Sequence, residues 1–145
     1  MIQRIDVHAI LQASIPGLYT DLVTRPTGRV VREHIERAIV DTTVALIDFT
    51  GVRCIDYSCA DEIVAKLVLP AARPSRPVVL LGIRDEQREA LDHVLSHHGV
   101  AVTGRLHESG EPVLLGAATP DLHQAFAALR ERGATLDDFA RLPIS

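Results

Sequence analysis

Three side chains that can do chemistry, those of Asp56, Ser58 and Cys59, lie within four residues of one another. A carboxylate can act as a general base or hold a turn through backbone bonds. A hydroxyl can accept a phosphate or cap a helix, and a thiol can become a nucleophile. The segment follows an apolar run and precedes a helical pattern, where the first N–H groups of a helix lack partners. The sequence therefore predicts a small polar site at the start of a helix.

Ser58 and Asp56 each have a structural and a functional interpretation. As an N-cap, Ser58 would accept a hydrogen bond from an N–H near Ala60 or Asp61, in a spacing similar to a shortened capping box. As a regulatory residue, it would accept a phosphate on the same hydroxyl. Asp56 would hold the turn, or act as a base or face a partner. We favour the turn-holding role. Between the two functional roles, the absence of a second catalytic group nearby in the sequence favours a partner-facing carboxylate over a general base.

The two cysteines are expected to be unreactive. Asp56, Asp61 and Glu62 are anionic neighbours, and negative charge raises the pKa of a thiol, so a nucleophilic Cys59 is disfavoured. Cys54 ends an apolar stretch and is expected in the core. Two cysteines without a disulfide framework are typical of a reducing cytosol.

Metal, nucleotide and DNA sites are not predicted elsewhere in the chain. His93 and His97 can supply two ligands, but neither a third ligand nor an HExxH pattern accompanies them. The residues around Gly82 follow a strand without a phosphate-binding glycine pattern. Residues 129–142 resemble a helical DNA-reading pair in outline, but acidic residues begin the second helix, so we interpret this segment as packing.

Composition restricts the class of protein further. The chain has 145 residues, 47% of them hydrophobic and only 3% aromatic, which predicts one domain with an aliphatic core. A net charge of −4 argues against general nucleic-acid binding. Neither a secretory leader nor an apolar run of about 18 residues is present, so we expect a cytoplasmic protein without membrane contact. No cofactor is expected.

The apolar pattern predicts alternating strands and helices. Strands are expected around residues 5–10, 44–49, 78–83, 100–103 and 112–115, and helices over residues 29–40, 59–71, 85–99, 119–133 and 135–142. Thr119 and Thr135 are expected to cap the last two helices, and Gly99 to end the third. This order predicts an α/β fold over residues 1–145, with a sheet of about four to five strands and helices packed on it.

Residues 48–67 also carry a family resemblance. Asp48-Phe49-Thr50-Gly51-Val52 leaves the buried strand, Asp56 and Ser58 follow in the turn, and Ala60-Asp61-Glu62 begins the helix. This pattern resembles the STAS domain, the fold of bacterial anti-sigma factor antagonists. It is closer still to a STAS-like branch of uncharacterised bacterial proteins.

The resemblance implies a cytosolic regulatory module that binds a protein partner, which would be a GHKL-type ATPase/kinase, an anti-sigma factor or another regulatory protein. In that family a partner kinase phosphorylates a serine that matches Ser58, and the unphosphorylated form binds the partner. The implied binding surface consists of Asp56, Tyr57, Ser58, Cys59, Asp61 and Glu62.

The sequence departs from the family pattern at two positions. Tyr57 replaces a first serine, and Cys59 replaces a glycine, which matters if that backbone position needs a positive φ. A phosphate on Ser58 would also lie beside the acidic side chains of the same segment, whose like charge opposes it. On the residues alone, two other functions stay open. One is a small enzyme or ligand-binding protein that uses Asp56, Ser58 and Cys59 with a histidine brought in by the fold, and the other is a structural subunit of a larger assembly.

Overall fold

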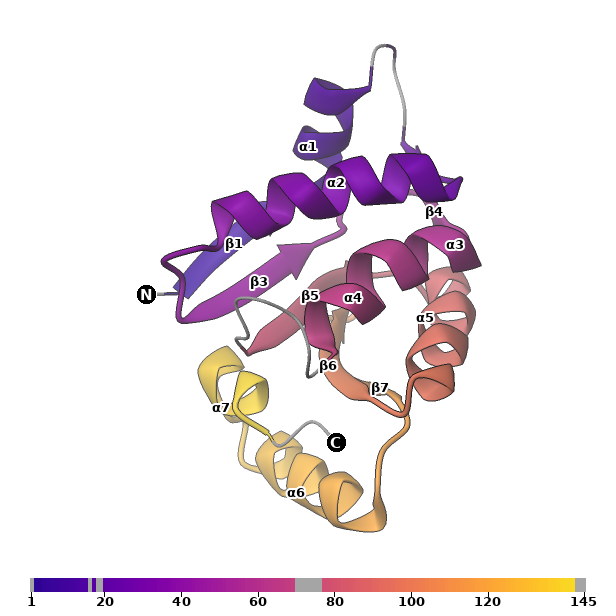
Figure 1. Cartoon of the computed structure of the whole chain (residues 1–145). Coiled ribbons are helices and arrows are strands. Elements are labelled where there is room, and N and C mark those ends of the chain that lie inside the picture. The colour runs from indigo at the N-terminus through magenta and orange to yellow at the C-terminus, as the bar shows by residue number, and fades with distance from the viewer. Residues whose placement is uncertain (1, 16, 18–19, 70–76, 143–145) are drawn as a thin grey trace.

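The computed structural model describes residues 2–15, 17, 20–69 and 77–142. Within them, a mixed five-stranded sheet has the order β1-β3-β5-β6-β7 (Figure 1). The strands are β1 (Ile2–Asp6), β3 (Val44–Asp48), β5 (Val78–Ile83), β6 (Ala101–Leu106) and β7 (Pro112–Gly116). The first four strands in this order run parallel to one another, and β7 is antiparallel to β6. The predicted α/β fold with four to five strands is confirmed.

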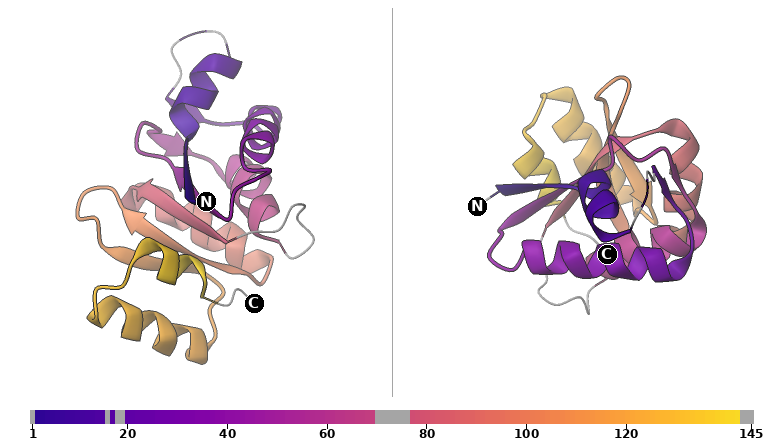
Figure 2. Two further views of the ribbon diagram at one scale, coloured as in Figure 1. Left: turned by 90° about the vertical axis from the view of Figure 1, so that its left-hand side faces the viewer. Right: turned by 90° about the horizontal axis from the view of Figure 1, so that it is seen from above.

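Helices cover both faces of this sheet. The helical elements are α1 (Val7–Ser14), α2 (Arg25–Ala38), α3 (Tyr57–Cys59), the π-helical η1 (Ala60–Ala65), α4 (Lys66–Val68), α5 (Asp85–His97), α6 (Pro120–Glu131) and α7 (Leu136–Ala140). In the right-hand view of Figure 2, α2 and α7 lie on opposite sides of the strands. The face under α2, η1 and α5 holds the larger hydrophobic core, and α7 covers the smaller one.

The apolar run of β3 is explained by burial on both faces. Ala45 and Ile47 belong to the larger core, whereas Val44 and Leu46 pack in the smaller core under α7. Because successive side chains of a strand point to opposite faces, both sets must be apolar. β3 ends at Asp48, and the chain then continues toward the turn that carries the predicted site.

A second, two-stranded sheet lies beside that turn. It pairs β2 (Asp21–Leu22) with β4 (Cys54–Ile55) in parallel. The predicted core position of Cys54 is wrong, because its side chain is exposed while Ile55 is buried. Strand alternation places only one of two adjacent residues inside.

Several helices and strands begin or end at other residues than the sequence predicted. The first strand ends at Asp6, whose carboxylate accepts a hydrogen bond from the Ala9 N–H (3.1 Å) and starts α1, a helix that the sequence analysis missed. Helix α2 begins four residues earlier than predicted, with Pro26 in its first turn. The helix expected over residues 59–71 begins at Tyr57, and residues 70–71 lie outside the described residues.

The ends of the later helices agree with prediction. Thr119 and Thr135 cap α6 and α7 with their side chains, and Gly99 follows α5 with a φ of +68°. No helix among the described residues combines the length and hydrophobicity that crossing a bilayer requires.

A bulge in β5 makes one glycine indispensable. Gly82 has a φ of +69°, and a Cβ there would lie 2.7 Å from the Thr50 backbone nitrogen. Gly99 has nearly the same φ but open space around it. The two positions therefore separate backbone strain from steric overlap.

We expect Gly82→Ala to lower the free energy of unfolding by about 3 kcal/mol and Gly99→Ala by about 1 kcal/mol. Urea denaturation of both variants measures the difference. An equal loss in the two variants would contradict the close contact between β5 and Thr50.

Candidate functional site

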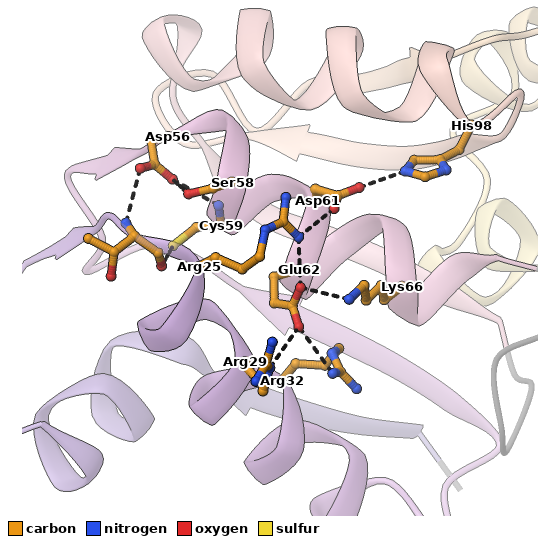
Figure 3. A network of polar contacts seen from close by, with 11 residues as sticks. Arg25, Arg29, Arg32, Asp56, Ser58, Cys59, Asp61, Glu62, Lys66 and His98 are labelled. Atoms are coloured by element: carbon orange, nitrogen blue, oxygen red, sulfur yellow. Dashed lines mark hydrogen bonds and ion pairs between the residues drawn. The ribbon is translucent and has the colours of Figure 1, made fainter.

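The Asp56 carboxylate joins the starts of two helices. One oxygen, Oδ1, accepts hydrogen bonds from the Cys59 N–H (2.8 Å) and the Ser58 hydroxyl (2.9 Å). The other, Oδ2, accepts a hydrogen bond from the Thr24 N–H (3.0 Å), just before α2 (Figure 3). The predicted N-cap role of Ser58 is therefore wrong, since Asp56 is the N-cap and Ser58 donates to it. The turn-holding interpretation of Asp56 is confirmed.

These hydrogen bonds keep Asp56 ionised. Burial alone would raise the pKa of its carboxyl, but the bonds from Cys59, Thr24 and Ser58 outweigh burial, and the pKa is lowered. A carboxylate with a lowered pKa is a weak base. Its role in the turn is to accept hydrogen bonds from groups that otherwise lack partners.

Thr24 is held in a strained backbone conformation. Its φ of +70° is positive, which among the described residues no other non-glycine residue shows. Such a conformation costs a β-branched residue about 1–3 kcal/mol. Asp56 binds its N–H, and the Cys59 thiol donates to its carbonyl oxygen (3.0 Å). The start of α2 thus depends on two residues of the predicted site.

Cys59 is enclosed and unreactive. Its side chain is buried, and burial together with the neighbouring Asp56 charge raises the pKa of the thiol to about 12. Its φ of −72° is ordinary helical geometry, so the position needs no glycine. The room for its sulfur comes from Gly28 of α2, where a Cβ would approach the sulfur to 3.3 Å.

Glu62 is fully buried among basic side chains. Arg25 Nη1 lies 2.8 Å and Lys66 Nζ 2.7 Å from Oε2, while Arg32 Nη2 lies 3.3 Å and Arg29 Nε 3.5 Å from Oε1. Burial would raise the pKa of Glu62, but the bonds from Lys66, Arg25 and Arg32 lower it to about 2. Sequence analysis missed these four cations. Their signal was the spacing of the three arginines along one face of α2.

Asp61 belongs to the same network. Arg25 Nη1 lies 2.7 Å from one of its oxygens, and His98 Nε2 lies 2.6 Å from the other. Burial would raise the pKa of Asp61, but the bonds from Arg25 and His98 lower it. The two acidic residues after Ser58, Asp61 and Glu62, are therefore compensated by basic groups, which weakens their part of the repulsion that the sequence predicted for a phosphate.

An open groove of about 520 Å³ runs between the start of α3 and the C-terminal half of α5. Tyr57, Ser58 and Asp61 form one side, with Arg25 beside them, and His93, Val94, His97 and His98 form the other. The Tyr57 ring lies 5.0 Å from that of His93, and its hydroxyl donates to Glu89 (3.1 Å). Ser58 is half-buried and Tyr57 is 48% exposed, so both are within reach of a visiting molecule.

The groove divides the predicted binding residues into two groups. Tyr57, Ser58 and Asp61 line it, and Asp56 is partly exposed behind them. Cys59 and Glu62 are buried, so their side chains support the surface and do not form it. His93 and His97 both line the groove, but no group of three potential metal ligands occurs among the described residues.

No family model, curated protein or solved structure matches the chain. The resemblance of residues 48–67 to STAS domains therefore stays a prediction that rests on the sequence pattern.

The buried Glu62 makes acid stability testable. Its pKa of about 2 lies below the ordinary value of 4.5, so its charge stabilises the fold above that ordinary value and the benefit disappears as pH falls through about 2. We expect Glu62→Gln to be less stable at neutral pH by about 2–3 kcal/mol and to depend less on pH between about 5 and 2. Urea denaturation across this range measures both effects.

Glu86→Gln, at an exposed position of α5, is the control and should behave like the wild type. Wild-type stability in Glu62→Gln at neutral pH, or an unchanged acid dependence, would contradict the network.

Proposed function

We propose that the protein is a cytosolic regulatory module of STAS type that binds a protein partner through the Ser58 groove and is switched by phosphorylation of Ser58. The observation that carries this proposal is the position of the Ser58 hydroxyl. It lines an open groove and at the same time donates to Asp56, the carboxylate that holds two helix starts. A change at this one atom therefore reaches both the surface and the framework behind it.

A phosphate on Ser58 would change the groove in two ways. It adds about −1.5 to −2 charges beside a carboxylate that is already ionised. It also removes the hydroxyl hydrogen with which Ser58 donates its hydrogen bond to Asp56. A partner fitted to the unmodified groove would then meet a different charge and shape.

The second effect extends to α2. Asp56 holds Thr24 in its strained conformation, and Arg25 follows directly with its guanidinium on Asp61 and Glu62. Repulsion between a phosphate and Asp56 weakens the hold on Thr24. The position of Arg25, which lines the groove, changes with it.

The proposed partner is a GHKL-type ATPase/kinase or an anti-sigma factor, as the family resemblance implies. An enzyme built on Asp56, Ser58 and Cys59 receives less support. The thiol is buried with a raised pKa, and both Asp56 oxygens accept hydrogen bonds from the protein itself.

Two Ser58 variants test the switch. We expect Ser58→Ala to keep the partner and Ser58→Asp to reduce its capture by about tenfold or more, because the added charge repeats part of the effect of a phosphate. Immobilised wild type and variants are compared by quantitative mass spectrometry of proteins bound from native host cells. Ser96→Asp, on an exposed face of α5 outside the groove, is the matched control and should bind like the wild type.

Equal capture of the same proteins by Ser58→Ala and Ser58→Asp, with both variants folded by circular dichroism, would refute the proposal.

A further inference from the structure

A second groove, of about 320 Å³, runs along the outer edge of the sheet. Its floor is formed by residues 112–114 of β7, one wall by Arg88 of α5, and the other by residues of α6 that include His123, Phe126 and Arg130. Figure 1 shows β7 next to both helices, and β7 is the last strand in the sheet order. This groove shares no lining residue with the Ser58 groove.

The groove follows the backbone edge of β7. Successive strand residues face opposite ways, and here Val113 packs against the larger core while Leu114 lines a pocket with Phe139 of α7 on the other face. A cavity in contact with both residues, and with helices from both faces, must lie along the strand's edge.

The edge offers a short stretch of backbone. The Ala117 N–H donates to the Val100 carbonyl oxygen (2.9 Å), and the Glu111 carbonyl oxygen accepts from the Leu106 N–H (3.0 Å). The backbone N–H and C=O groups of the odd-numbered residues of this strand therefore point toward β6. Leu114 therefore faces outward with its N–H and C=O. On either side of it, Pro112 has no N–H and the Gly116 N–H donates to Asp92 (2.8 Å). An incoming strand can pair here only over a few residues.

The charge of the groove specifies what such a strand should carry. Arg88, His123 and Arg130 line it, and none of its lining residues within the described part of the chain is acidic. Arg88 and Arg130 each have one exposed acidic neighbour, Asp85 at 3.5 Å and Glu111 at 3.6 Å. Exposed ion pairs of this kind contribute little to stability, so both guanidinium groups stay available to bind another carboxylate.

We propose that the edge of β7 is a docking groove for an extended acidic segment of a partner protein. The segment adds to the sheet through Leu114, and its carboxylates bind Arg88 and Arg130 while its apolar side chains pack on Leu114 and Ala127, which are not buried. A second copy of this chain is disfavoured as the occupant, because symmetric pairing would bring the same arginines together. This surface is additional to the Ser58 groove and does not depend on the proposed switch.

Two synthetic peptides with blocked ends test the proposal, one built from Val-Val-Glu-Glu repeats and the other from Val-Val-Lys-Lys repeats. Adjacent residues of a strand face opposite ways, so each pair of charged residues can reach both Arg88 and Arg130. Each is titrated into the ¹⁵N-labelled protein, and amide shifts are followed by NMR. We expect the glutamate peptide to shift the amides of Leu114 and its neighbours saturably, and less so at high salt. Arg130→Glu should weaken this peptide about tenfold and bind the lysine peptide instead.

Arg132→Glu, two residues further along and 64% exposed at its side chain, is the matched control and should bind the glutamate peptide like the wild type. The proposal is overturned by an absence of shifts, by equal binding of both peptides, by Arg130→Glu behaving like wild type, or by shifts confined to the Ser58 groove. A dimer that buries β7 in sedimentation and NMR measurements without peptide would also overturn it.

Discussion

The arrangement of the candidate site depends on one carboxylate that serves two helices. Asp56 binds the Thr24 N–H, which precedes α2, and the Cys59 N–H in the first helical turn after Asp56, and it does so with separate oxygens. The strained conformation of Thr24 persists because this carboxylate and the Cys59 thiol hold it from both sides. Ser58 donates to the same carboxylate from the groove. A surface hydroxyl is thereby connected to the backbone of an element more than thirty residues earlier in the chain.

Charge compensation makes the acidic segment after Ser58 compatible with the fold. A buried carboxylate is costly unless it is paired and hydrogen-bonded, and Glu62 meets that condition through side chains of α2 and through Lys66. Asp61 shares Arg25 with Glu62 and reaches His98 at the end of α5. The packing of α2, η1 and α5 around the groove is thus fixed by ion pairs as well as by apolar contacts. Removing a basic partner changes the surface as well as the stability.

Local patterns predicted the strands and helix ends that depend on neighbouring residues. The apolar run of β3 and the threonine caps of α6 and α7 are of this kind. Features that depend on distant residues were not predicted, because no local pattern says which distant side chains meet. The apolar residues Ile5 and Val7 were interpreted as one strand, but Val7 is the first residue of α1. The sequence around Glu62 gives no indication that arginines of α2 bind this carboxylate. The positive φ of Thr24 was also missed, because a positive φ is usually indicated in the sequence by a glycine and this position has none.

The pH dependence of two amide signals tests the central claim most directly. If one Asp56 carboxylate binds both the Thr24 and the Cys59 N–H, the two amide proton shifts should titrate together in ¹⁵N NMR spectra. Their common midpoint should lie below the ordinary pKa of an aspartate, because the pKa of Asp56 is lowered by these bonds after burial is overcome. Separate midpoints, or a Thr24 amide that does not respond, would contradict the account.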